Sequence, residues 1–260
     1  METISAPFYD FPKYYDLVYG SDWKAEYDFL LACFKKHAAG KVRRLFEPAC
    51  GTGRLLVKLA AAGYKVGGND LNSKAVAYCN ARLARHGYPP SAKVGNMADF
   101  RLQRPVDAAF NTINSFRHLT SESAALSHLQ CMAAALRFGG LYVLGLHLTP
   151  GVGEPIDEES WSARRGNLAA LARLWVTKRD QRKRQETVGM SYDIYTPTRQ
   201  FRILDRCCFR TYTARQLSGL LKKVPAFELT SIYDFSYDIS RTLKIDSQSE
   251  DVVLILRKIV

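Results

Sequence analysis

The stretch Glu47-Pro-Ala-Cys-Gly-Thr-Gly-Arg54 decides how the rest of this 260-residue chain is interpreted. It follows a short apolar segment, Arg43–Glu47, and it precedes a helical pattern of leucines. A glycine-rich turn between a strand and a helix is where an open α/β sheet binds nucleotides. Glycines let the backbone turn sharply, and the amides at a helix start suit a carboxylate or a phosphate. We therefore expect a ligand site at Gly51 and Gly53.

Two common nucleotide motifs do not match this turn. The dinucleotide fingerprint needs a third glycine three residues after Gly53, and Leu56 stands there instead, which argues against NAD. A P-loop needs Gly-Lys-Ser/Thr, which the turn lacks.

On either side of the turn, strands alternate with helices. Strands are predicted at 43–47, 64–70, 92–95, 106–111, 141–146, 228–235 and 252–257, and helices at 73–85 and from about 120 to 139. Strands that alternate with helices of this length indicate a parallel sheet with helices on both faces. The predicted fold is therefore α/β, a Rossmann-like, seven-stranded, mostly parallel sheet.

Two regions depart from this alternation. We expect a helical N-terminal cap over residues 1–40. The Rossmann-like domain is expected to consist of residues 41–148 and 213–260. Residues 149–212 predict an antiparallel β insertion, because apolar and polar side chains alternate with period two, as over 188–194. Tyr195–Arg199 is typical of a hairpin turn within it. The insertion would cover the site as a lid or form a homodimer interface.

Charge and composition narrow the class of protein. The formal net charge is +12, from 37 Lys and Arg against 25 Asp and Glu, and the basic residues are spread along the chain. Arg202, Arg206 and Arg210 share one predicted strand face, which indicates either a solvated surface or contact with a phosphate-bearing substrate or RNA. No apolar run reaches bilayer length, and the N-terminus lacks a secretory signal, so we expect a cytoplasmic protein without a membrane partner.

The six cysteines show no C-x-x-C spacing and the chain has no H-E-x-x-H motif, so we expect no metal site.

The residues Glu47, Ala49, Gly51 and Gly53 match the pattern E-x-A-x-G-x-G. This pattern resembles the first motif of class I S-adenosylmethionine-dependent methyltransferases, with alanine where glycine is commoner. Asp70 ends the second predicted strand, seventeen residues after Gly53, where a carboxylate can accept both ribose hydroxyls. The alternative is a purely structural turn with Asp70 as a helix cap.

Two further stretches extend the resemblance. Gly95–Phe100 is similar to the family's G-D-M-x-D-F motif, which implies that Asn96 and Met97 hold the adenine, Asn96 replacing an aspartate. Asp107–Leu119 is similar to the fourth-strand motif of small-molecule methyltransferases. The resemblance covers residues 12–147 and, more loosely, the segment around 209–216. The cofactor-binding residues that it implies are Tyr15, Tyr19, Trp23, Glu47, Ala49, Cys50, Gly51, Gly53, Arg54, Asp70, Leu71, Asn96, Met97 and Asn111.

Methyl transfer to an amine or a hydroxyl requires a proton acceptor near the reacting methyl group. The candidates are Asn111, Asn114 and His118 after the fourth strand, and Tyr14, Tyr15 and Tyr19 near the N-terminus. Tyr15–Tyr19 and Arg117–Leu119 are similar to sugar-amine N,N-dimethyltransferases, which implies that Tyr15 and His118 are the catalytic residues. Where those enzymes usually have Asp-Tyr, this chain has Asp22-Trp23 and lacks the hydroxyl.

The sequence therefore predicts a methyltransferase that uses S-adenosylmethionine to alkylate nitrogen or oxygen of a small molecule. Two alternatives stay open. An RNA-directed methyltransferase is favoured by charge alone, and the chain lacks the Asp/Asn-Pro-Pro-Tyr/Phe motif of many enzymes that methylate base amines. The other alternative is a non-catalytic, Rossmann-type nucleotide-binding protein.

Overall fold

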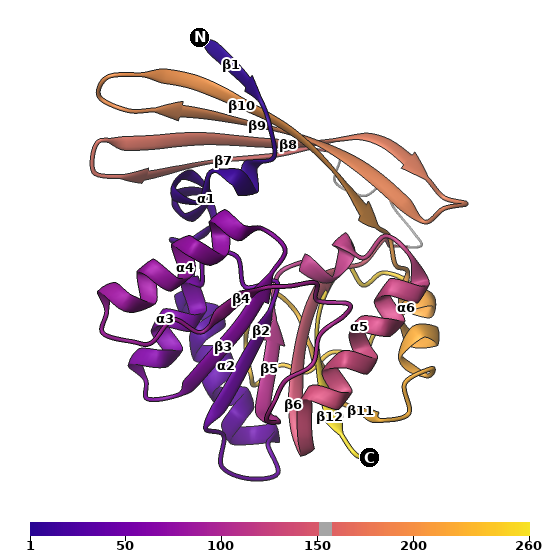
Figure 1. Ribbon diagram of the computed structural model, residues 1–260. Helices are drawn as coiled ribbons and strands as arrows, with labels where there is room; N and C mark the ends of the chain where they lie inside the picture. The colour runs from indigo at the N-terminus through magenta and orange to yellow at the C-terminus, as the bar shows by residue number, and fades with distance from the viewer. Residues whose placement is uncertain (151–157) are drawn as a thin grey trace.

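Two β-sheets build the molecule, and the computed structural model describes residues 1–150 and 158–260 of it. Figure 1 shows the smaller sheet lying across one end of the larger, helix-covered sheet, with the first helix between them. No helix in the described residues is both long enough and apolar enough to cross a bilayer.

The larger sheet has seven strands in the order β11-β12-β6-β5-β2-β3-β4. Its strands are β2 (Arg44–Pro48), β3 (Lys65–Asp70), β4 (Ala92–Val94), β5 (Val106–Asn111), β6 (Leu136–His147), β11 (Phe227–Tyr233) and β12 (Asp251–Lys258). All are parallel except β12, which runs antiparallel to both β6 and β11. The predicted Rossmann-like, mostly parallel sheet is confirmed.

Helices cover both faces of this sheet, because its central strands are apolar on both sides. The helices are α2 (Lys24–His37), α3 (Arg54–Ala61) and α4 (Ser73–Arg85) on one face, and α5 (Glu122–Ala135) and α6 (Ala214–Leu221) on the other. The boundary between α5 and β6 differs most from the prediction. The helix expected to reach Gly139 ends at Ala135, because Leu136 already pairs with Val106 of β5.

The smaller sheet, which we call the lid sheet, has five strands in the order β1-β10-β9-β8-β7. They are β1 (Glu2–Ser5), β7 (Glu158–Arg165), β8 (Leu168–Asp180), β9 (Gln185–Tyr195) and β10 (Gln200–Arg210). The predicted antiparallel insertion and its hairpin turn are confirmed, with the Thr196 amide donating to the Arg199 carbonyl at 2.9 Å. Residues 151–157 of the predicted insertion lie outside the described residues.

The N-terminal segment is not helical throughout. Glu2–Ser5 forms β1, which pairs in parallel with β10, so the expectation of a purely helical cap is wrong there. The physical reason is that β10 would otherwise be an edge strand with unpaired backbone groups. The short helix η1 (Phe8–Asp10) and helix α1 (Pro12–Tyr19) follow.

A third core joins the N-terminal helices to the lid sheet. Phe8 stacks on Tyr192 with ring centroids 3.5 Å apart, and Leu17 and Val18 are buried beside the inward side chains of β9 and β10. The N-terminal segment is therefore fixed between the two sheets, above the ends of the parallel strands (Figure 1).

Candidate active site

The glycine turn lies where the motif predicts, between β2 and α3. Its backbone takes left-handed conformations at Ala49, Gly51 and Gly53, with φ of 53°, 51° and 67°. At Gly53 a side chain is also excluded by packing, because a Cβ atom there would lie 2.3 Å from Sγ of Cys79 on α4. The turn thus packs tightly against α4.

Asp70, at the end of β3, faces this turn. Its Oδ2 accepts the Gly51 amide at 2.8 Å, and its Oδ1 accepts the Asn72 amide at 2.8 Å. Burial raises the pKa of the Asp70 carboxyl, and the two amides oppose that shift. Each carboxylate oxygen retains a second lone pair, so Asp70 can still accept two hydroxyl groups.

Two buried acceptors near the turn have no partner. Glu47 Oε2 and Asn111 Oδ1 are inaccessible and accept no hydrogen bond, while Asn111 Nδ2 donates to the Pro48 carbonyl at 2.8 Å. Burial raises the pKa of Glu47 well above its usual value, although Arg54 opposes that shift. Unpaired buried acceptors cost free energy. An ammonium group bound at this turn would relieve that cost and favour the ionised form of Glu47.

The segment expected to hold adenine follows β4. Asn96 is exposed, and its Oδ1 accepts a hydrogen bond from the Ala98 amide at 2.9 Å. One of the two lone pairs of that oxygen is therefore already engaged. Met97 is buried in the core beside α5, and its carbonyl oxygen is hydrogen-bonded to His128 Nδ1 at 2.8 Å. Leu71, beside Asp70, is 70% exposed. The adenine contacts of these residues stay a prediction.

Tyr15 is placed over the turn by its neighbour Asp16. A Cβ atom at Gly51 would lie 3.9 Å from the Tyr15 ring. Asp16, which is 1% exposed, forms ion pairs with Arg82 of α4 and, at 2.9 Å, with Arg165 of the lid sheet. Burial raises the pKa of Tyr15 to about 12.

Tyr9, which the sequence did not indicate as a site residue, lies between Tyr15 and His118. The hydroxyl of Tyr9, in η1, is 3.0 Å from His118 Nε2. The Tyr9 ring centroid is 5.4 Å from that of Tyr15 and 5.8 Å from that of His118. Tyr15, Tyr9 and His118 therefore form a continuous row that starts above Gly51. No motif contains Tyr9, because only the folded chain brings it to His118.

The remaining predicted residues point elsewhere or serve the fold. The Tyr19 hydroxyl pairs with that of Tyr192 at 2.9 Å. Trp23 packs edge-on against Tyr27, with the Lys58 ammonium 4.2 Å above its ring. Tyr14 contacts Phe201 of the lid sheet.

Three more predicted residues are committed to local contacts. Asn114 Oδ1 accepts the His147 amide at 2.7 Å. Arg54 forms an ion pair with Glu26, and its Nη1 donates to the Asp22 carbonyl at 3.2 Å. Cys50 is buried, and its thiol is hydrogen-bonded to that of Cys79.

A cavity of about 250 Å³ lies between the lid sheet and the larger sheet. Phe209 lines the cavity, and its ring packs against His118 with centroids 4.7 Å apart. Polar groups in the lining include Arg117, Glu186 and Asp251. The cavity is large enough for a small polar molecule, and Phe209 links its lining to His118.

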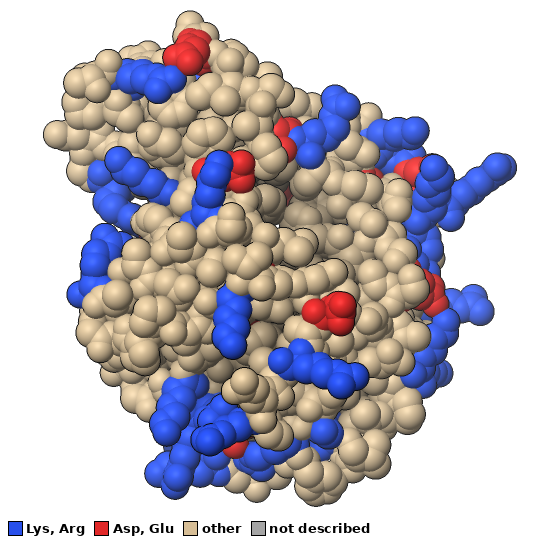
Figure 2. Space-filling view, in the orientation of Figure 1, with Lys and Arg blue, Asp and Glu red and all other residues tan. Residues whose placement is uncertain are grey.

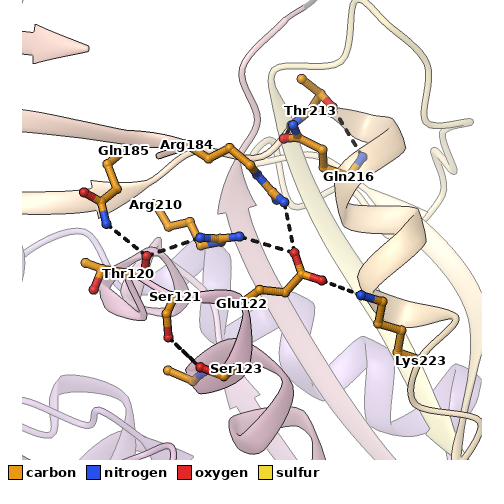
Figure 3. A network of polar contacts seen from close by, with 11 residues as sticks. Thr120, Ser121, Glu122, Ser123, Arg184, Gln185, Arg210, Thr213, Gln216 and Lys223 are labelled. Carbon is orange, nitrogen blue, oxygen red and sulfur yellow. Dashed lines mark hydrogen bonds and ion pairs between the residues drawn. The ribbon is translucent and has the colours of Figure 1, made fainter. Parts of the chain in front are cut away.

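An ionic network fixes the lid sheet to the helix that follows His118 (Figure 3). One carboxylate, that of Glu122, binds Arg184 Nη1 at 3.1 Å, Arg210 Nη2 at 3.4 Å and Lys223 Nζ at 2.5 Å. Arg210 also donates to the carbonyl of Thr120, two residues beyond His118, at 3.2 Å. The ends of β9 and β10 are thereby held against the segment that carries His118.

Two of the three arginines predicted to share a face of β10, Arg202 and Arg210, are paired with acidic side chains. Arg202 forms a bidentate pair with Asp193 at 2.5 and 2.7 Å, and Arg210 is buried in the network around Glu122. In Figure 2, basic side chains are spread over both parts of the visible face.

Within the described residues, no group of His, Cys, Asp and Glu could hold a metal ion.

Comparison with known proteins shows what the part of the chain that carries this site is similar to. Residues 46–140 match the methyltransferase domain family. A Geobacillus sp. (strain WCH70) protein whose name carries a provisional methyltransferase assignment is 25% identical over 140 residues, which are 54% of this chain and 57% of that protein. The chain thus spans little more than half the length of this relative.

Solved structures resemble the chain over nearly its whole length. An S-adenosylmethionine-dependent methyltransferase from Clostridium acetobutylicum superposes with a TM-score of 0.79 at 14% identity, covering 97% of this chain and 99% of that one. The S-adenosylmethionine-bound amino pentose methyltransferase CalS10 from Micromonospora echinaspora gives 0.72 at 16%, covering 98% and 99%. The sugar N-methyltransferase KedS8 from Streptoalloteichus gives 0.72 at 18%, covering 92% of each chain.

The match to the methyltransferase domain family includes the glycine turn, Asp70 and Met97. The predicted resemblance to the class I, S-adenosylmethionine-dependent methyltransferases is confirmed by this match and by the fold. S-adenosylmethionine is the cofactor of that class. The glycine turn, the carboxylate of Asp70 and the unpartnered acceptors Glu47 and Asn111 fit such a group.

Proposed function

We propose that this protein transfers the methyl group of S-adenosylmethionine to a nitrogen or oxygen atom of a small molecule. The observation that carries the proposal is the row of Tyr15, Tyr9 and His118. It begins above Gly51 and ends at the His118 ring, which packs against Phe209, a residue of the cavity lining. A cofactor bound at the turn would then lie on one side of these side chains and an acceptor on the other. The bound cofactor supplies an electrophilic methyl group.

Each part of the chain would have a defined task. The turn at Gly51 and Gly53 binds the methionine portion, with Glu47 and Asn111 accepting from its ammonium group. Asp70 binds the ribose, and Asn96 with Met97 borders the adenine. Methyl transfer is an in-line displacement, so orientation and exclusion of water supply much of the rate.

The lid sheet and the N-terminal segment would exclude water from this site. We assign residues 1–40 and 149–212 to this cover, over a cofactor domain formed by 41–148 and 213–260. The solved neighbours named as acting on amino pentoses and sugars make amino sugars the first acceptors to examine. Dimerisation through the lid sheet stays a prediction, which sedimentation velocity would test.

Two experiments in sequence test the proposal. Differential scanning fluorimetry should show stabilisation by S-adenosylhomocysteine and none by NAD; stabilisation by NAD alone would refute the cofactor assignment. A screen with methyl-labelled S-adenosylmethionine over amines, amino sugars and phenols should then label an acceptor. Binding without labelling of any acceptor would favour the non-catalytic alternative, and labelling of RNA would favour the RNA-directed one.

A further inference from the structure

The end of the larger sheet opposite the glycine turn is strongly basic. The parallel strands begin at this end, so the connections that lead into them lie there. None of these connections contains Asp or Glu, and three of them contain Lys or Arg; they are residues 38–43, 62–64, 86–91, 136–140 and 222–226. Figure 2 shows basic side chains gathered at the lower end of the molecule, where Figure 1 places the connection from α2 to β2.

Contacts between these connections bring their basic side chains onto one surface. The Lys65 amide donates to the Arg43 carbonyl at 2.8 Å, and Lys258 Nζ donates to the first carbonyl of β6 at 2.8 Å. The bulge at the start of β6 packs against the connection from α2 to β2, since a Cβ atom at Gly139 would lie 2.8 Å from that of Ala39. The starts of β2, β3 and β6 and the end of β12 are therefore neighbours.

The two acidic residues at the starts of these strands are already paired. Asp107, the second residue of β5, accepts two backbone amides at the entry to β2, at 2.8 Å each, and binds Arg137 Nε at 2.6 Å. Glu228, the second residue of β11, lies 3.7 Å from Arg257. Each of these carboxylates therefore offsets an arginine of its own.

Other basic side chains at this end have no such partner. Lys41, Arg43 and Lys65 are exposed, and none of the three forms an ion pair in the part of the chain that the structure describes. Their charges are therefore free to attract an anionic surface.

Two exposed apolar side chains stand among these charges. Phe138 is 72% exposed and lies in the β6 bulge, where the register with β5 shifts. Bulges commonly re-aim a side chain. Ile259 is 40% exposed and directly follows Lys258. We call these basic and apolar side chains together the basal surface: Lys41, Arg43, Lys65, Phe138, Lys258 and Ile259.

We propose that the basal surface binds the surface of an anionic phospholipid bilayer, a contact that goes beyond the proposed methyl transfer. The basic side chains lie among the lipid headgroups, and Phe138 and Ile259 enter the boundary with the acyl chains. The expectation of no membrane partner rests on the lack of a spanning segment, which a peripheral contact does not require. The glycine turn lies at the other end of the strands, so the cofactor site faces away from the lipid.

A single-stranded nucleic acid is the other polyanion that such a surface could bind. Its bases would stack on an aromatic ring and its phosphates would contact the basic side chains. Ile259 has no ring on which a base can stack, whereas an aliphatic side chain suits the interface of a bilayer. The pairing of Phe138 with an exposed aliphatic side chain therefore favours lipid.

Vesicle cosedimentation of the full chain tests the proposal. The probes are vesicles of phosphatidylglycerol and phosphatidylcholine in equal parts, and vesicles of phosphatidylcholine alone. One variant removes the apolar tip, Phe138→Ser. The basal variant removes three charges by Lys41→Gln, Arg43→Gln and Lys65→Gln.

The matched control removes the same number of charges from the lid sheet. It carries Lys178→Gln in β8 and Arg182→Gln and Lys183→Gln in the turn that follows, and all three positions are exposed. The control and the basal variant therefore have the same net charge and differ only in where the charge is lost.

We expect the wild-type protein to bind the anionic vesicles and not the neutral ones. Each basic side chain near the membrane contributes about fivefold to the partition coefficient. The basal variant should therefore bind about a hundredfold more weakly, and the control within about twofold of the wild-type protein. Phe138→Ser should weaken binding about tenfold. Raising the salt concentration from about 0.1 to about 1 M should release the protein, since the screening length falls from about 10 to about 3 Å.

Three results with vesicles would each overturn the proposal: equal binding to neutral and anionic vesicles, equal losses in the basal variant and the control, or unchanged binding by Phe138→Ser. The comparison of vesicles and the release by salt use the wild-type protein alone, so they decide the matter even where a variant does not fold. Fluorescence anisotropy with a labelled oligouridylate tests the alternative. Binding of this RNA that the basal variant loses, without binding of vesicles, would overturn the proposal in favour of nucleic acid.

The proposal and the proposed function can fail separately. Isothermal titration with S-adenosylhomocysteine should give the same affinity for the wild-type protein and Phe138→Ser, because the basal surface lies at the other end of the sheet. Failure of the wild-type protein to bind S-adenosylhomocysteine would overturn the proposed function, whereas binding to anionic vesicles would still support the basal surface as a membrane contact.

Discussion

Asp16 is the residue whose removal tests most sharply how Tyr15 is held above the glycine turn. Its carboxylate is 1% exposed and forms ion pairs with Arg82 and Arg165, and the Thr52 hydroxyl lies 3.4 Å from Oδ1. One side chain thus joins α1 to α4, to the glycine turn and to the lid sheet. We expect Asp16→Asn to destabilise the fold and to displace Tyr15.

The magnitude follows from these contacts. Breaking a buried ion pair by removing one partner costs ~3–5 kcal/mol. The amide of Asn retains some hydrogen bonds, and the Arg165 side chain is 56% exposed and can turn into solvent. The expected loss is therefore at the lower end, ~3 kcal/mol in the free energy of unfolding. The matched control is Asp28→Asn on α2, whose partner Lys24 lies 2.6 Å away at an exposed site, where we expect a loss below ~0.5 kcal/mol.

The pH dependence of this loss has a definite sign. Burial raises the pKa of Asp16, but the hydrogen bonds and charges of Arg82 and Arg165 outweigh it, so the net shift is downward. The contribution of the carboxylate is present above the unfolded-state pKa of about 3.9 and is lost as pH falls through the lower folded-state value. Urea unfolding at pH 7.5 and through the acid range measures both effects. A loss within 0.5 kcal/mol of the control, or one that does not shrink in acid, would refute the reasoning.

Three further outcomes follow from the site. Gly53→Ala should cost ~2–4 kcal/mol, since it combines a left-handed backbone with overlap on Cys79, whereas Gly63→Ala, at φ 90° with open space, should cost only ~1–2 kcal/mol in urea unfolding. The imidazole of His118 should stay neutral from pH 7.5 to 5.5 by NMR, because burial lowers its pKa to about 4; a midpoint near 6.5 would contradict this. Glu122→Gln should cost ~1–2 kcal/mol, since it removes the one carboxylate that binds three cations, and a cost near zero would contradict the role of this network.

The larger sheet and the glycine turn could be predicted because their signals are local. The strand before Gly51, the helix after it and Asp70 at the end of the next strand are all encoded within about thirty residues. The period-two alternation of β9 and β10 likewise predicts strands. The alternation does not indicate which sheet β9 and β10 join. The separate lid sheet and the pairing of β10 with β1 are therefore seen only in the folded chain.

The rest of the candidate site depends on contacts between distant segments. Tyr9 meets His118 across 109 residues, and Asp16 meets Arg165 across 149. The alternation of β10 predicts Arg202 and Arg210 on a solvated or ligand-binding face. In the structure they pair with Asp193 and Glu122, and alternation along one strand cannot indicate these partners.

The central claim is that the turn at Gly51 and the carboxylate of Asp70 bind the cofactor of a methyltransferase. Isothermal titration of the wild-type protein and of Asp70→Asn with S-adenosylhomocysteine, and of the wild-type protein with NAD, tests it most directly. We predict saturable binding of S-adenosylhomocysteine, at least tenfold weaker binding by Asp70→Asn because two ribose hydrogen bonds to a charged acceptor are weakened, and no binding of NAD. Binding of NAD, or equal affinity of the wild-type protein and Asp70→Asn for S-adenosylhomocysteine, would contradict it.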